Sequence, residues 1–285
     1  MAELTKRDGG VLHYEVTGPD DGPTLLLIEG LSAHMLGWRE EFTHFFRDAG
    51  YRVVRFDNRD VGLSQRYPGQ SYGLSELAED THDLIDHLGS APVHVVGQSM
   101  GGMIAQHLVT LFPDDVASLT LLYTTASAAH INTGARGPHS PSVERRASTR
   151  DEAIELHIVQ ERLCASRTYS FDEAWKRELG GRMWNRGYDP DGVARQTRAV
   201  FAHSTDLSRL SSICVPTLLI HGTADRLIDY DASVELYAAI SGSELWLVEG
   251  MGHDLPRELW PSLTSLIVAN AAKARTAVAA EEQSA

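Results

Sequence analysis

The chain has 285 residues, of which 42% are hydrophobic and 22% are charged, and its formal net charge at pH 7 is −14. This composition is typical of a globular protein that folds without a disulfide or a metal, and the negative charge argues against nucleic acid as a partner. No apolar run approaches the roughly 20 residues that span a bilayer, and residues 1–8 lack the apolar core of a signal peptide, so we expect a cytoplasmic protein without a membrane partner.

An antiparallel hairpin is expected at the beginning of the chain. Residues 11–16 alternate apolar and polar side chains directly after the sequence Asp-Gly-Gly at 8–10, a pattern typical of a strand at the edge of a sheet. Four short apolar runs follow, at residues 24–28, 53–56, 92–96 and 119–123. Continuous apolar runs of this length predict strands of a parallel sheet that is covered on both faces.

Amphipathic stretches separate these runs. Apolar side chains recur at helical spacing around residues 38–46, 77–88 and 103–111, and a helix-ending residue follows each stretch, namely Gly50, Gly89 and Pro113. The same rhythm returns late in the chain, with strands expected at 216–221 and 244–248, a helix at 232–240 and a last helix after Pro256. The repetition predicts the fold class α/β, with a mostly parallel central sheet of about eight strands flanked by helices.

Residues 126–205 interrupt this rhythm because they carry no strand signal. We expect several helices here, reached through the Gly- and Pro-containing residues 134–141. The simplest arrangement is a helical cap inserted between two strands, with residues 1–125 and 206–285 forming the core domain. A separate helical domain is the alternative.

Ser99 is the first candidate for a catalytic residue. Residues 97–101, with the sequence Gly-Gln-Ser-Met-Gly, fit the pattern Gly-x-Ser-x-Gly and lie between a predicted strand and a predicted helix. A sharp strand-to-helix turn forces the serine into a strained backbone conformation that lifts its hydroxyl above the sheet edge. The glycines let the strand and the helix approach closely. This context predicts a nucleophilic serine.

A serine hydroxyl needs a base and an orienting acid, which should follow in the order acid then histidine on loops after two strands. Asp225 and His253 each follow one of the late predicted strands. We predict that His253 moves the proton and that Asp225 fixes the tautomer of His253 and stabilises its charged form. Asp229 and Asp254 are the alternative acids.

Other titratable residues are expected to have no chemical role. His94 and His221 lie on predicted strands, and no two histidines share a helix at a metal-ligand spacing. The two cysteines, Cys164 and Cys214, predict neither a disulfide framework nor a metal site. We therefore expect no metal and no cofactor.

Two backbone N–H groups are expected to bind the oxyanion of the reaction. One belongs to Met100, directly after the nucleophile and at the N-terminus of a predicted helix. The other belongs to Leu31, in the loop after the strand at 24–28. Gly30 is expected to contact substrate because it permits close approach of the backbone.

These motifs together resemble the α/β-hydrolase superfamily. The residues that carry the resemblance are 57–64 (Asp-Asn-Arg-Asp-Val-Gly-Leu-Ser), 97–102, 221–225 (His-Gly-Thr-Ala-Asp) and 252–253 (Gly-His). Residues 57–60 and 250–256 are further similar to bacterial esterases of the aclacinomycin methylesterase type, which cleave a methyl ester on an aromatic polyketide. The resemblance implies that Asp57 and Arg59 are a loop-fastening pair. It departs from the family at Glu29, because many members have His-Gly where this chain has Glu-Gly.

The combined residues predict a serine hydrolase that cleaves a carboxylic ester of a small or medium apolar substrate through an acyl-enzyme on Ser99. Trp175 and Trp184 of the cap are expected to bind the substrate, with Tyr169, Phe171 and Met183 as further candidates. A lactonase, an amidase or a cofactor-free perhydrolase using the same residues is an alternative, as is a non-catalytic hydrolase-like receptor. The expected partner is a small-molecule ester, and a homodimer stays open.

Overall fold

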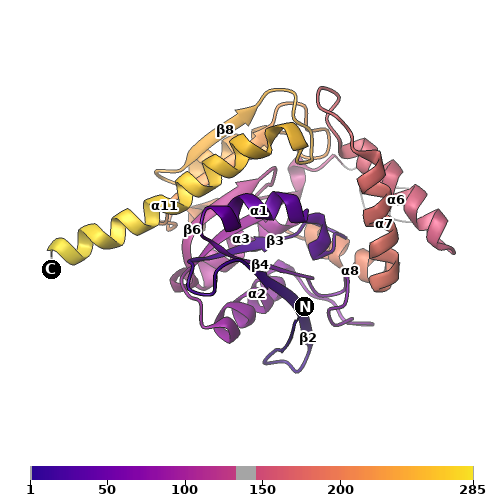
Figure 1. Ribbon diagram of the computed structural model, residues 1–285, viewed down its shortest axis with the longest axis horizontal. Coiled ribbons are helices and arrows are strands. Elements are labelled where there is room, and N and C mark those ends of the chain that lie inside the picture. The colour runs from indigo at the N-terminus through magenta and orange to yellow at the C-terminus, as the bar shows by residue number, and fades with distance from the viewer. Residues whose placement is uncertain (1, 133–145, 285) are drawn as a thin grey trace.

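The central element of the protein is a sheet of eight strands, seen in a computed structural model that describes residues 2–132 and 146–284, with side chains up to residue 274. The strands are β1 (Ala2–Thr5), β2 (Val11–Thr17), β3 (Thr24–Ile28), β4 (Arg52–Phe56), β5 (Val93–Gln98), β6 (Val116–Leu122), β7 (Thr217–Gly222) and β8 (Glu244–Val248). They lie in the order β1-β2-β4-β3-β5-β6-β7-β8 (Figure 1). The β1–β2 and β2–β4 pairs are antiparallel and all other pairs are parallel. The predicted edge hairpin and α/β class are confirmed.

Helices cover both faces of the sheet because successive strand residues point to opposite sides. In β3, Leu25 and Leu27 belong to one hydrophobic core, whereas Leu26 and Ile28 belong to the other. The first core includes residues of α1 (Glu40–Asp48) and α11 (Trp260–Ser284), and the second includes residues of α2 (Leu74–Leu88), α3 (Met100–Leu111) and α10 (Asp231–Ala239). Every residue of β3 is buried, which is why this strand is a continuous apolar run.

The helix ends follow the residues that can terminate them. Gly89 caps α2 with a φ of 57°, and Gly50 follows α1 with a φ of 88°, both in the left-handed region that favours glycine. The N-terminus of α1 differs from the expectation, since Trp38 lies before the helix in an extended conformation. Its ring stacks on Phe42 at a centroid distance of 6.0 Å. Trp38 therefore shares the apolar face of α1 without being part of the helix.

In the described part of the predicted cap region lie three α-helices, α6 (Arg150–Cys164), α7 (Glu173–Gly187) and α8 (Pro190–Phe201). We call them the cap helices. Helices α6 and α7 pack against each other and lie on the opposite side of the molecule from the projecting end of α11 (Figure 1). Residues 127 and 204 form an isolated bridge, so the two ends of the inserted segment meet. The expected connection at residues 134–141 lies outside the described residues.

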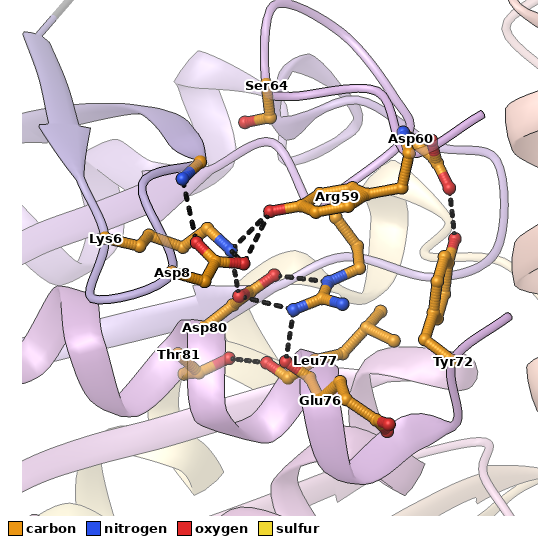
Figure 2. Close-up of polar contacts among 12 residues, drawn as sticks. Lys6, Asp8, Arg59, Asp60, Ser64, Tyr72, Glu76, Leu77, Asp80 and Thr81 are labelled. Carbon is orange, nitrogen blue, oxygen red and sulfur yellow. Dashed lines mark hydrogen bonds and ion pairs between the residues drawn. The ribbon is translucent and has the colours of Figure 1, made fainter. Parts of the chain in front are cut away.

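The loop after β4 is fastened to the core by a buried ion network. Arg59 donates to Asp80 of α2 at 2.6 and 2.7 Å, and the Nζ of Lys6 donates to the same carboxylate at 2.5 Å (Figure 2). The side chains of these three residues are at most 8% exposed. Since both cations share one carboxylate, the network ties the loop to α2 and to the turn after β1.

The same loop is also the attachment point of two cap helices. Asp57 accepts hydrogen bonds from the N–H groups of residues 35 and 63 and pairs with Arg186 of α7 at 2.5 Å. Asp60 pairs with Arg195 of α8 at 2.6 Å and accepts the Tyr72 hydroxyl at 2.6 Å. As the resemblance implied, both Asp57 and Arg59 have a structural role in this loop. Each residue fastens the loop through a different partner.

Candidate active site

Ser99 lies at the turn between β5 and α3. Its φ of 54° and ψ of −122° are an unusual combination for a residue with a side chain. A Cβ at Gly97 would collide with the carbonyl group of Gly101, and a Cβ at Gly101 would collide with the carbonyl of Ile28. The strand and the helix are thus too close for side chains at either position, and the turn projects the serine hydroxyl from the end of the strand.

The structure brings the serine, the histidine and the acid together in one hydrogen-bonded row. The Nε2 of His253 is 2.8 Å from the Oγ of Ser99, and its Nδ1 is 2.7 Å from the Oδ2 of Asp225. An ionised carboxylate only accepts hydrogen bonds, so Nδ1 carries the proton of the neutral ring and Nε2 accepts from the serine. The Asp225 side chain is fully buried and that of His253 is 7% exposed.

The carboxylate of Asp225 is surrounded by donors. Its Oδ1 accepts the N–H groups of Leu227 at 2.8 Å and Ile228 at 3.0 Å, and its Oδ2 also lies 3.2 Å from the Nε2 of His221. Burial by itself raises the pKa of Asp225, but the charge of His253 and the hydrogen bonds from His221 and His253 outweigh it and hold the pKa well below its usual range. Asp225 is therefore ionised at neutral pH.

His221, for which we predicted no chemical role, contacts the acid. Its Nδ1 lies 2.6 Å from the hydroxyl of Ser233, and its Nε2 faces both Asp225 and the carbonyl of Ile228, at 3.2 and 3.1 Å. Because Nε2 faces two acceptors, it carries the proton and Nδ1 accepts from the serine. The position of His221 at the end of β7, four residues before the acid, was the available signal in the sequence.

The alternative acids occupy other positions. Asp254 accepts the N–H of Ser166 at 3.2 Å, and burial raises the pKa of Asp254 to about 6. Asp229 accepts the N–H of Asp231 at 3.0 Å, at the start of α10. The Nδ1 of His94 lies 2.9 Å from the Ser118 hydroxyl within the sheet.

The loop that carries His253 is held by the segment after α6. The N–H of His253 donates to the carbonyl of Cys164 at 2.8 Å, and the Ser166 hydroxyl donates to the carbonyl of Gly250 at 2.5 Å. A Cβ at Gly252 would lie 2.5 Å from the backbone nitrogen of Ser166. The two segments are therefore packed backbone against backbone, and the imidazole is positioned from the cap side as well as by Asp225.

Two N–H groups lie free beside the serine. Among the described residues, the N–H groups of Met100 and Leu31 have no protein acceptor. Met100 is the first residue of α3, where the helix dipole is positive. A Cβ at Gly30, next to Leu31, would lie 3.3 Å from the Cβ of Ser99. Two N–H groups without a protein acceptor next to the nucleophile are what the binding of an anion at the serine requires.

A family model described as the α/β hydrolase fold matches residues 23–256. The chain belongs to the α/β-hydrolase family. Rhodomycin D methylesterase DauP from Streptomyces sp. (strain C5) is 28% identical over 94% of this chain and 96% of its own length. Two solved structures share the fold. A hydrolase from Pseudomonas aeruginosa PA01 has a TM-score of 0.76 at 23% identity, over 94% of this chain and 97% of that one. The esterase EaEST from Exiguobacterium antarcticum has a TM-score of 0.76 at 20% identity, over 94% and 98%.

A cavity of about 600 Å³ opens above Ser99 in this α/β hydrolase. Its wall combines loops of the core with α6, α7 and the residues between them, and includes Trp38, Phe42, Tyr123, Trp175, Phe171 and Met183. Trp175 also contacts Arg39, whose guanidinium carbon lies 4.7 Å from the ring centre. Trp184 lines a different cavity, of about 120 Å³, and stacks on Tyr188 at 5.0 Å. The hydroxyl of Tyr169 donates to the carbonyl of Glu249 at 3.0 Å.

A second row of hydrogen-bonded polar side chains in the hydrolase lies near the serine. The Oε2 of Glu29 accepts the Nε2 of Gln98 at 2.5 Å and the N–H of Gly30 at 3.0 Å. Tyr123 donates its hydroxyl to the Oε1 of Gln98, and its ring centre lies 4.7 Å from that of His253. Burial raises the pKa of Glu29 to about 7 despite the two hydrogen bonds. Sequence reasoning noted Glu29 only as a departure from the family and missed Gln98 and Tyr123.

Within the part of the chain that the structure describes, no group of three or more His, Cys, Asp or Glu side chains could hold a metal ion. No described helix combines the length and the apolar character needed to cross a bilayer.

Proposed function

We propose that this α/β hydrolase is a carboxylic-ester hydrolase that forms an acyl-enzyme on Ser99. His253 is the base in this proposal, and Asp225 holds its tautomer and stabilises its charged form. The observation that carries the proposal is the hydrogen-bonded row of Ser99, His253 and Asp225 beside two unoccupied N–H donors. A receptor that only bound a ligand would not need this arrangement.

The reaction follows from the positions of these groups. As Oγ of Ser99 attacks the ester carbon, Nε2 of His253 takes the hydroxyl proton, and the carbonyl oxygen becomes an anion that the N–H groups of Met100 and Leu31 bind. The imidazolium then gives this proton to the alcohol oxygen as the C–O bond breaks. A water molecule attacks the acyl carbon, His253 takes its proton, and Ser99 recovers that proton as the acid leaves.

The cavity supports a substrate of small or medium size with an apolar part. Its wall includes the rings of Trp38, Phe42 and Trp175, and its volume of about 600 Å³ lies in the range of small-molecule sites. The relative from Streptomyces is named a methylesterase, which favours a methyl ester as the scissile group. In this proposal, residues 126–205 form the cap that closes the cavity above Ser99.

The test compares the wild type with Ser99→Ala on p-nitrophenyl acetate, p-nitrophenyl butyrate and methyl esters of apolar acids. Loss of the nucleophile should lower kcat by at least about 10⁴-fold. Ser212→Ala removes an exposed hydroxyl far from the cavity and should keep wild-type turnover. Equal turnover by wild type and Ser99→Ala would contradict the proposal. A lactone and an anilide in the same panel, compared by kcat/KM, decide between ester, lactone and amide preference.

A further inference from the structure

The carboxyl group of Glu29 is enclosed at the end of β3, directly before the two residues that approach Ser99. Glu29 is 1% exposed. Its Oε1 lies so close to Gly37 that a Cβ there would collide with it, and among the described residues this oxygen has no hydrogen-bond partner. Its Oε2 accepts both available donors, from Gly30 and Gln98. Oε2 therefore accepts two hydrogen bonds, and Oε1 lies against the backbone of Gly37.

Hydrogen bonds link Glu29 to the backbone next to Leu31 and, through Gln98, to Tyr123 beside His253. Its bond to the N–H of Gly30 orients the backbone directly before Leu31, whose own N–H stays free. Its backbone carbonyl accepts a hydrogen bond from the side-chain amide of Asn58 at 3.2 Å, which holds the peptide between Glu29 and Gly30 in place. Through Gln98 the row continues to Tyr123, whose ring packs on His253. A change in the charge of Glu29 therefore reaches the place where the oxyanion would form.

The surroundings of Glu29 favour the neutral carboxyl until about neutral pH. Burial is the largest influence and raises the pKa of Glu29 to about 7, whereas Gln98, Gly30 and the charge of Lys176 lower it and Glu161 raises it. The other charged or titratable side chains that line the same cavity come from several elements: Arg39 after the 3₁₀ turn at residues 35–37, His157, Glu161 and Cys164 of α6, Asp172 before α7, Lys176 of α7, His253 and Asp254 after β8, and Arg257 and Glu258 before α11. Tyr123 also faces Glu29, but burial raises the pKa of its hydroxyl well above the usual range.

We propose that Glu29 is a positioning residue of the ester hydrolysis and that its neutral form supports the reaction. Uncharged, it holds Gly30 and Gln98 in place without adding a negative charge beside the oxyanion. Ionised, its enclosed carboxylate repels the oxyanion. The inference rests on the proposed function, because it concerns the transition state of that reaction.

The inference predicts a loss of activity as pH rises through neutrality. Because the charge acts on the oxyanion and not on the neutral ester, kcat should fall while KM changes little. If the ionised form is inactive, the fall approaches about tenfold per pH unit once Glu29 has titrated. The fall should begin near pH 7, where Glu29 ionises.

The experiment measures kcat and KM of the wild type and of Glu29→Gln on p-nitrophenyl butyrate, from about pH 6 to about pH 9, with the enzyme-free rate subtracted. Glutamine keeps the size of the side chain and the acceptor for Gly30 but cannot ionise. We expect kcat of the wild type to fall at least about tenfold across the alkaline half of this range, and that of Glu29→Gln to stay within about twofold. Asp254→Asn removes a half-buried carboxyl that lines the same cavity and should keep the alkaline fall.

Two cap variants test the same inference without altering Glu29. Lys176→Met removes a cation, so the pKa of Glu29 should rise and the alkaline fall in kcat should move to higher pH. Glu161→Gln removes an anion and should move the fall to lower pH. These two side chains pair with each other across the cap helices and are about one-fifth exposed (21% and 20%). Each variant therefore breaks one partly exposed ion pair, which the folded chain should tolerate. Shifts in opposite directions identify the titrating group as one that faces both residues.

The outcomes separate this inference from the proposed function. If the wild type hydrolyses no ester, or Ser99→Ala hydrolyses esters equally well, the proposed function fails and takes this inference with it. If the wild type acts through Ser99 but Glu29→Gln keeps the alkaline fall, only the role of Glu29 is overturned. Unmoved profiles in both Lys176→Met and Glu161→Gln overturn it as well, even if Glu29→Gln does not fold.

Discussion

Two buried carboxyl groups flank Ser99, and they ionise in different pH ranges: Asp225 is ionised well below neutral pH, whereas Glu29 ionises near pH 7. On the loop after β7, the Asp225 carboxylate contacts two backbone N–H groups and two imidazoles, and its pKa lies well below the usual range. At the end of β3, Glu29 has two donors on one oxygen, and its pKa is raised to about 7. The Asp225 side chain is 0% exposed and Glu29 is 1% exposed. Since both side chains are almost fully enclosed, the charge of His253 and the hydrogen bonds of the two imidazoles account for the lower pKa of Asp225.

One edge of the sheet thus holds both an ionised carboxylate, Asp225, and a carboxyl group that ionises near neutral pH, Glu29. The turn after β7 directs the N–H groups of Leu227 and Ile228 at Asp225. The loop after β3 directs only one N–H at Glu29 and leaves the next free for the substrate. Substituting one carboxyl at a time therefore tests whether the two groups ionise as differently as their surroundings indicate.

The largest effect is expected on the anionic side. Asp225→Asn presents an amide to Nδ1 of His253, so the ring adopts the wrong tautomer and cannot accept the proton of Ser99. We expect kcat on p-nitrophenyl butyrate to fall about 10⁴-fold with little change in KM. Asp229→Asn, which keeps the start of α10 capped, is the matched control and should stay near wild type. A loss of less than about tenfold for Asp225→Asn would show that the acid is not needed.

The next effect concerns stability and has opposite signs on the two sides. The folded protein holds the proton of Glu29 up to about pH 7, whereas the unfolded chain releases it near the ordinary value of 4.5, so wild-type stability falls as pH rises between these values. The difference corresponds to about 3 kcal/mol. Glu29→Gln should therefore be more stable than wild type by up to this amount at about pH 8 and gain less at about pH 5, as measured by urea unfolding.

Asp225 supplies the comparison for that measurement. Its folded pKa is depressed, so its ionisation stabilises the fold above the ordinary value of 3.8 and this contribution is lost as pH falls through the folded value. Asp225→Asn should therefore destabilise the protein at neutral pH, where Glu29→Gln does not. A stability change of the same sign in both variants would contradict the assigned charge states.

The smallest effect is expected at His221, whose Nε2 faces the carboxylate of Asp225. His221→Asn removes the donor that faces Asp225, whereas His221→Gln can place an amide N–H near the position of Nε2. Losing one buried donor should lower kcat about tenfold in the asparagine variant, with less loss in the glutamine variant. Steady-state kinetics on p-nitrophenyl butyrate measures both. Equal losses would mean that the donor at 3.2 Å does not position Asp225.

Much of the fold could be predicted because it depends on local patterns. Buried parallel strands are short apolar runs, and the loops after β5, β7 and β8 meet at one edge of the sheet whatever their sequence. That rule alone places Ser99, Asp225 and His253 near one another, and the structure brings these three residues together.

The side-chain partners could not be predicted in the same way. Asp57 and Arg186 are 129 positions apart in the chain, and nothing local indicates their contact. The row from Glu29 to Tyr123 depends on the register of three strands and on rotamers. Helical geometry does separate the two tryptophans, because residues nine apart on α7 project to opposite sides of the helix. This agrees with Trp175 and Trp184 lining different cavities.

The backbone contacts between residues 164–166 and the loop at 250–254 have a consequence for protein engineering. A cap that contacted only the substrate could be exchanged freely, but the cap region of this chain also holds the loop that carries His253. A chimera that takes its lid from another member of the family would have to keep residues 164–166 of the present chain. Without them, the graft would change the placement of the imidazole together with the choice of ester.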